Sequence, residues 1–219
     1  MTQAKIKTKP EMNILKEEEI PHLLVPGEVG AVLEFTVRDK KGNVTQHQVM
    51  KSRSFVRQFL ELLWVQATQI PEIKCYSIKD WANFTRDVPA SGYVFASDAL
   101  ANDHSYGIIV GTGTTAPTIN DYVVEAKISH GTGAGQLQYS AVSFGAPASD
   151  ATTSQFTITR DFANASGGAI TVNEIALYVK GYRYDSTYHF MTIRDVISGG
   201  ILVPDGQTLT VNYRPQATV

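Results

Sequence analysis

The sequence has 219 residues, of which 43% are hydrophobic and 18% are charged, and its formal net charge is -2. A chain of this length can bury a sizeable core, and all-β proteins of this size often form one domain. The small net charge gives no electrostatic reason to expect nucleic acid or an anionic membrane as a partner. The only cysteine, Cys75, excludes an intrachain disulfide and a thiolate metal cluster within one chain.

Residues 1–26 form a segment of mixed charge that ends in the apolar residues Leu23, Leu24 and Val25. Such a composition, with little core of its own, predicts an extended N-terminal arm. Two interpretations stay open: a disordered tail, or an arm whose Leu23 to Val25 add a strand to the sheet edge of a neighbouring subunit. The polar start and the lack of an apolar run of about 20 residues favour neither a secretory signal nor a membrane span. We therefore expect synthesis in a cytoplasm.

A β-hairpin is predicted directly after the arm. Apolar and polar residues alternate over Val29–Asp39, which is the period of a strand with one buried face. Lys40–Asn43 has turn composition, and Val44–Met50 supplies the second strand.

The period then changes to that of a helix, over about residues 54–70. Apolar residues recur at helical spacing, Ser52 or Ser54 could cap the N-terminus, and Pro71 follows the last turn. The apolar stripe is wide, so we expect the helix to cover one face of the sheet, with a subunit contact as the alternative.

The stretch from residue 71 to 106 contains aromatic residues without a clear period. It could cross the surface of the sheet or form a contact surface, because Tyr and Trp are enriched at interfaces. Trp81 and Tyr93 are the candidates here, and Tyr184 and Tyr188 are candidates further along the chain.

For residues 107–142 we predict a strand, a loop, a short helix and another strand. The strand Gly107–Val110 leads into Gly111–Pro117, which lacks the Gly-Lys-Ser/Thr end of a phosphate loop and is interpreted as a connection. A helical piece is expected around Asn120–Ile128, and a strand near Leu137–Val142.

Strand-like runs fill the rest of the chain. They are Gln155–Phe162, Ala169–Lys180, His189–Ile197, Ile201–Val203 and Gln207–Arg214. The last two are predicted to form a hairpin closed by Asp205-Gly206. In Ala169–Lys180 the apolar residues change parity near Asn173, so either a β-bulge lies there or both faces are covered.

Charged residues lie inside these otherwise apolar runs, namely Arg160, Asp161, Glu174, Arg194 and Asp195. A buried charge needs a partner, so we expect Glu174 to pair with Arg160 or Arg194 and to fix the register of adjacent strands. The alternative is that all five side chains face solvent.

The run Ile170–Tyr178, with the sequence ITVNEIALY, resembles a signature in tail-fibre and other virion proteins of tailed bacteriophages. Further pieces of the same general kind are Gly107–Gly113, Ile128–Gly131, Thr159–Gly167 and Ile193–Val196. Ala176 departs from the pattern, which usually has Gly at that position. The resemblance covers about half of the chain and implies a non-enzymatic part of a virion.

These observations together predict a mainly antiparallel, jelly-roll-like β-sandwich over residues 27–219, with one amphipathic helix and the N-terminal arm. The expected role is structural: a tail-associated adaptor, fibre-attachment or baseplate component, with a capsid decoration or cement protein as the alternative. The expected partners are copies of the chain and tail, portal-proximal or capsid proteins, in a virion assembled in the host cytoplasm.

Catalytic chemistry has little support in the sequence. The five histidines are scattered, there is no Gly-x-Ser-x-Gly elbow, and the aspartates lie in turns or beside arginines. We therefore expect no catalytic, metal or cofactor site. A binding module for host-surface glycans is a further alternative, with stacking faces supplied by Trp81, Tyr93, Tyr182, Tyr184 and Tyr188.

Overall fold

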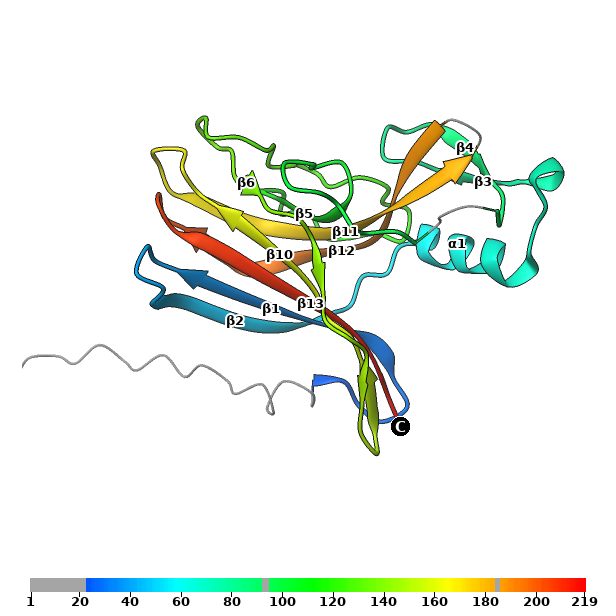
Figure 1. The fold of residues 1–219 in the computed structure, drawn as a ribbon, viewed down its shortest axis with the longest axis horizontal. Coiled ribbons are helices and arrows are strands. Elements are labelled where there is room, and N and C mark those ends of the chain that lie inside the picture. Colours follow the sequence, from blue (N-terminus) through cyan, green and yellow to red (C-terminus); the bar gives the residue numbers. More distant parts are fainter. Residues whose placement is uncertain (1–22, 92–94, 184–185) are drawn as a thin grey trace, which may run out of the picture.

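The computed structural model describes residues 23–91, 95–183 and 186–219, which form a mainly antiparallel β structure with one α-helix (Figure 1). The larger sheet has the central order β2-β1-β13-β10-β6, and the smaller sheet has the order β12-β11-β5. The strands of the larger sheet are β1 (Val29–Arg38), β2 (Val44–Ser52), β6 (Gln138–Tyr139), β7 (Ser143–Phe144), β8 (Ala148–Ser149), β9 (Thr153–Gln155), β10 (Ile158–Ala163) and β13 (Thr208–Thr218). The remaining elements are α1 (Arg57–Thr68), the 3-10 helix η3 (Glu72–Lys74), the hairpin β3 (Tyr76–Lys79) and β4 (Thr85–Val88), and the smaller sheet's β5 (Gly107–Gly111), β11 (Ile170–Arg183) and β12 (Ser186–Val203).

The main core lies between the two sheets, as expected for a sandwich. In β1 the residues of one parity, from Ala31 to Val37, are fully buried, which explains the alternation in the sequence. They pack with Leu209 and Val211 of β13 and with residues of the smaller sheet such as Val172. The predicted hairpin is confirmed as β1 and β2, and its turn is held by Asp39, which accepts hydrogen bonds from the amides of Lys41 and Asn43.

A second, smaller core lies beside the sandwich, under α1. Its members come from α1, from the β3–β4 hairpin and from the ends of β11 and β12 that extend beyond the main core: Leu62, Val65, Ile78, Val88, Val179 and Phe190. Figure 1 shows α1 and the β3–β4 hairpin together at one end of the molecule.

Both alternatives for the parity change in β11 hold: the register shifts near Asn173, and residues 174–179 are buried on both faces. The pairing of β11 with β12 shifts between Val172 and Glu174, and four residues of β12 lie opposite the break. Two of these, Gly199 and Gly200, have positive φ values of 80° and 63°, which glycine adopts without strain. The shift explains why apolar residues change parity along β11.

The predicted hairpin of Ile201–Val203 with Gln207–Arg214 is wrong. Residues 201–203 end β12 and pair with β11 in the smaller sheet, whereas β13 pairs with β1 and β10 in the larger sheet. The Asp205-Gly206 turn therefore links two sheets. Asn164 accounts for this path, because its side chain donates to the carbonyl of Val203 and its own carbonyl accepts from the amide of Gly206.

The serine N-caps predicted for the helix are also wrong. The N-cap is Val56, and no side chain caps it. Ser52 instead donates through Oγ to Asp195 at 2.6 Å, and the carbonyl of Ser54 accepts from the amide of Arg194. Residues 52–56 thus run along β12 and join the two sheets, a tertiary role that overrides the capping preference.

Two more local predictions change in the structure. Residues 120–128 contain no helix, because side chains of the smaller sheet bind their backbone. Leu24, for which a disordered tail and a strand on a neighbouring subunit were the two interpretations, is buried in its own chain against Val32 and Val49. In the part of the chain that the structure describes, no helix is long and apolar enough to cross a membrane.

Candidate functional site

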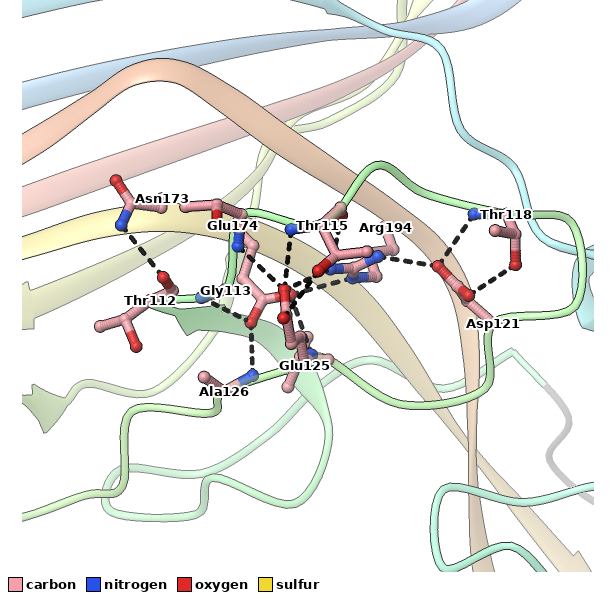
Figure 2. Close-up of polar contacts among 12 residues, drawn as sticks. Thr112, Gly113, Thr115, Thr118, Asp121, Glu125, Ala126, Asn173, Glu174 and Arg194 are labelled. Carbon is pink, nitrogen blue, oxygen red and sulfur yellow. Dashed lines mark hydrogen bonds and ion pairs between the residues drawn. The ribbon is translucent and has the colours of Figure 1, made fainter.

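The polar centre of the molecule lies where the predicted residues Glu174 and Arg194 meet a long loop. Glu174 is on β11, directly after the register break, and its backbone lies opposite Gly111 of β5 and Val196 of β12. In this central strand its side chain is fully buried. Residues 112–126, which follow β5, fold back over the carboxylate (Figure 2).

Both oxygens of the Glu174 carboxylate accept hydrogen bonds. Oε1 accepts from the amides of Gly113 and Ala126, at 3.1 and 2.7 Å. Oε2 accepts from the amide of Glu125 at 3.0 Å and from Nε of Arg194 at 2.9 Å. Four donors compensate the loss of hydration that burial of a carboxylate causes. The loop from residue 112 to 126 is thereby fixed to the sheet at three backbone positions.

Arg194 is the partner of Glu174, and Arg160 is not. The Arg194 side chain is 3% exposed. Its Nη1 donates to Oδ2 of Asp121 at 2.8 Å, and its Nη2 donates to the carbonyl of Thr115 at 3.1 Å. Burial alone would lower the pKa of Arg194, but the hydrogen bonds to Glu174 and Asp121 outweigh burial and raise it.

The loop carries two further carboxylates, and both bind the loop itself. Asp121 accepts from the amide and the hydroxyl of Thr118, and with Arg194 these bonds lower its pKa although burial opposes the shift. Glu125 accepts from the amides of Thr114 and Thr115 and from the hydroxyl of Thr115, which lower its pKa. Loop carboxylates with many donors stay ionised beside the guanidinium.

The glycines of the Gly111-Thr112-Gly113 run make room for this carboxylate. A Cβ on Gly113 would lie 2.5 Å from Oε1 of Glu174 and 2.6 Å from Cβ of Glu125, and one on Gly111 would also collide with the carboxylate. The run thus admits an internal carboxylate, which agrees with its interpretation as a connection and not a phosphate loop.

Arg160 occupies a separate polar site, beside Tyr139 and the segment from residue 100 to 108. It lies on β10, is 1% exposed, and its guanidinium carbon is 4.8 Å from the ring centre of Tyr139. Its three nitrogens donate to backbone carbonyls, namely those of Leu100, Asp103, Tyr106, Ile108 and Ser140. Burial lowers the pKa of Arg160 to about 10. This arginine therefore anchors residues 100–108 as Arg194 anchors residues 113–126.

The predicted interaction residues that the structure describes lie in two regions, one at the start of the described chain and one at the β3–β4 hairpin, where the amide of Trp81 donates to the carbonyl of His189, next to Tyr188. Leu23 and Val25 are exposed, whereas Leu24 is buried within its own chain. Trp81 lies under Nζ of Lys127 at 5.0 Å, and the Tyr188 ring lies 4.6 Å from the guanidinium of Arg86. Tyr93 and Tyr184 lie outside the described residues.

The helix has an exposed apolar surface, although the sequence interpretation favoured a covered helix and kept a subunit contact only as the alternative. Only part of the helical stripe is buried: Leu62 and Val65 face the smaller core, whereas Leu60 is 63% exposed. We define the helix face as the residues around a hollow of about 550 Å³, namely Leu60, Leu63, Trp64, Ala67 and Tyr76 with Glu61 at its edge. A stripe too wide for one buried side was the signal that could have revealed it.

Within the described residues, no group of three or more His, Cys, Asp and Glu side chains could hold a metal ion. Comparison of the chain with protein-family models, with curated proteins and with solved structures gives no match.

Proposed function

We propose that this protein is a non-enzymatic structural component of a tailed-phage virion that acts by assembly, as a tail-associated adaptor, fibre-attachment or baseplate protein. The helix face is the observation that carries the assembly role. Its exposed residues include Leu60, Leu63 and Trp64, and Ile73 nearby is 90% exposed. Exposed apolar patches of this kind mark contacts between proteins.

The use of the buried charges supports the same proposal. Glu174 and Arg194 lie in the segments that resemble virion proteins. Their hydrogen bonds hold the loop of residues 112–126 in place. A general acid or base must exchange a proton with a bound reactant, whereas both Glu174 oxygens are buried and have donors. The arrangement suits a rigid structural part.

A capsid decoration protein has the same structural needs and remains the alternative within this class. Copy number separates the two, because decoration proteins follow the capsid lattice and tail components follow the symmetry of the tail. The glycan-binding alternative has weaker support, because Lys127 and Arg86 already occupy a face of the Trp81 and Tyr188 rings.

Quantitative mass spectrometry of purified particles tests the proposal. The expected ratio of this chain to the major capsid protein is low, as for a tail component. A ratio near one would replace the tail role by the decoration role, and absence from particles would overturn the virion assignment.

Substitution of the helix face tests the contact surface itself. We expect Leu63→Gln with Trp64→Gln to leave the chain folded, because both residues are about half exposed, but to reduce its incorporation into particles. Arg57→Gln, at an exposed position of the same helix, is the matched control and should be incorporated normally. Equal incorporation of both variants would show that the helix face is no assembly contact.

A further inference from the structure

Of the described residues around the hollow of the helix face, only Glu61 carries a charge. Its side chain is 20% exposed. Its neighbours around the hollow are apolar or aromatic, namely Leu60, Leu63, Trp64, Ala67 and Tyr76. Burial raises the pKa of Glu61, because the water that would stabilise the ionised form is displaced. A carboxylate in such a place is unfavourable unless a donor or a cation compensates it.

The chain itself gives this carboxylate little compensation. Oε2 of Glu61 is enclosed and accepts no hydrogen bond from the described residues. Oε1 has only a long ion pair with Arg57, whose Nε is 3.7 Å away, beyond hydrogen-bond distance. The Arg57 side chain is 46% exposed, so this pair contributes little. Glu174, by contrast, has four donors. The missing donor at Glu61 therefore indicates a group that a partner supplies.

The aromatic wall of the hollow suits a basic side chain that lies among apolar ones. The ring centres of Trp64 and Tyr76 are 4.9 Å apart, and the two residues are 48% and 37% exposed. Aromatic faces attract cations, and the alkyl stem of an arginine or a lysine packs on apolar surface. An occupant of this composition would cover the apolar side chains and bring its charge to Glu61.

We propose that the helix face binds an apolar segment of a neighbouring virion protein, and that an arginine or a lysine of this segment pairs with Glu61. This inference rests on the proposed assembly role and adds to it the chemistry of the partner. The apolar contacts then supply affinity, whereas the ion pair selects the partner and fixes its register, because a segment without the cation leaves the carboxylate unpaired.

Competition between the parent chain and Glu61→Gln for incorporation into particles tests the proposal. Glutamine keeps the size of the side chain but removes its charge, which leaves the partner's cation unpaired in the interface. We expect at least about tenfold less incorporation of Glu61→Gln than of the parent. Glu72→Gln is the matched control, since this glutamate lies on η3 and does not line the hollow, and it should be incorporated normally.

Thermal unfolding of the free chains separates this role from a structural one. The raised pKa means that the ionised Glu61 carboxylate destabilises the free chain at pH 7. Glu61→Gln should therefore unfold at the same temperature as the parent or at a higher one, although it is incorporated less. A lower temperature would overturn the proposal, because it would show that Glu61 is bound within its own chain, for example by the buried amide of Gln58.

The incorporation results also distinguish this inference from the proposed function. Equal incorporation of Glu61→Gln and the parent would overturn the pairing alone, provided that Leu63→Gln with Trp64→Gln still reduces incorporation. Normal incorporation of that double variant would remove the assembly contact, and the pairing with it.

A photocrosslinker identifies the occupant in assembled particles. Benzoylphenylalanine in place of Leu60, which lines the hollow and is 63% exposed, reacts with whatever covers the helix face. We expect mass spectrometry to find a crosslinked peptide of another virion protein, with an arginine or a lysine between apolar residues. A peptide without a basic residue, or a peptide of a second copy of this chain, would overturn the proposal.

Discussion

Arg160 and Arg194 both lie in the middle of β-strands and are almost fully buried, but the chain stabilises their charges in different ways. Arg194 is surrounded by carboxylates, with Glu174 and Asp121 in direct contact. Arg160 instead donates to five backbone carbonyls and lies over the ring of Tyr139. The pKa shifts follow this difference, since burial lowers the pKa of Arg160 whereas carboxylate partners raise that of Arg194.

The comparison shows two solutions to one problem of loop structure. Long connections without a ladder leave backbone groups that need partners. Around Arg160 the orphan groups are carbonyls, so a cation with several N–H donors binds them directly. Around Glu174 the orphan groups are amides, so a carboxylate binds them and an arginine then balances its charge. Whether the buried side chain is a cation or an anion thus depends on whether the backbone groups around it are carbonyls or amides.

The largest expected effect is at the arginine that has carbonyl partners. Arg160→Met keeps an apolar stem but leaves five carbonyls without their donor, so we expect a loss of about 4–5 kcal/mol in the free energy of unfolding. Urea denaturation of the full chain measures this. A loss below about 1 kcal/mol would mean that water replaces the guanidinium, and the carbonyl cage would not be an anchor.

The next effect is at the carboxylate. Glu174→Gln keeps the volume but turns an amide group towards backbone N–H donors and removes the charge opposite Arg194, which should cost about 3 kcal/mol. Asp98→Asn, which alters a carboxylate that is 63% exposed beside Lys180, is the control and should cost below about 1 kcal/mol. Equal losses for the two variants would refute the structural role of Glu174.

A steric test gives a smaller effect. Gly113→Ala would bring a Cβ against the Glu174 carboxylate and should cost about 2 kcal/mol, the scale of overpacking. Gly145→Ala is the matched control, because its Cβ would meet Thr157 at an ordinary 3.5 Å. Glu174→Ala should relieve the contact with the carboxylate but leave the one with Cβ of Glu125, so the double variant Gly113→Ala, Glu174→Ala should lose less than the sum of the two single losses. A loss equal to that sum would contradict the contact with Glu174.

The smallest effect is a pH dependence at Asp121. Its pKa is lowered in the folded state, so its contribution is present above the unfolded value of 3.8 and is lost as the pH falls through the folded pKa. Asp121→Asn should therefore reduce stability at pH 7, by below about 1 kcal/mol for this partly exposed group. The difference from the parent chain should shrink as the pH falls below the unfolded value of 3.8 and through the lower folded pKa. A difference that stays constant over this range would show that the ionised form is not what stabilises the loop.

The sequence predicted these features where the signal was local or periodic. Alternation identified the β1–β2 hairpin, and the parity change identified the break at Asn173. Charges inside apolar runs identified Arg160, Glu174 and Arg194, although the choice between the two arginines needed the structure. Within this chain, periodicity and buried charge were the reliable signals.

Tertiary contacts explain the failures. The Asp205-Gly206 turn is real, but a turn signal cannot tell whether the strands it joins belong to one sheet or to two. Ser52 donates to Asp195 and does not cap the helix. The Glu174 carboxylate binds the amides of Glu125 and Ala126, within the segment 120–128 that was predicted to be helical. The sequence left open whether the apolar stripe of the helix is covered or exposed, because apolar side chains can be assigned to the core only when their neighbours are known.

Hydrogen exchange of the Glu174→Gln chain tests most directly whether Glu174 fixes the loop to the sheet. We predict that the amides of Gly113, Glu125 and Ala126, which donate to its carboxylate, exchange at least about ten times faster, as expected for local opening eased by 1.4 kcal/mol or so. The amide of Asn102, which donates to the carbonyl of Tyr139 near Arg160, should keep its rate. Unchanged exchange at all three loop amides would contradict the account.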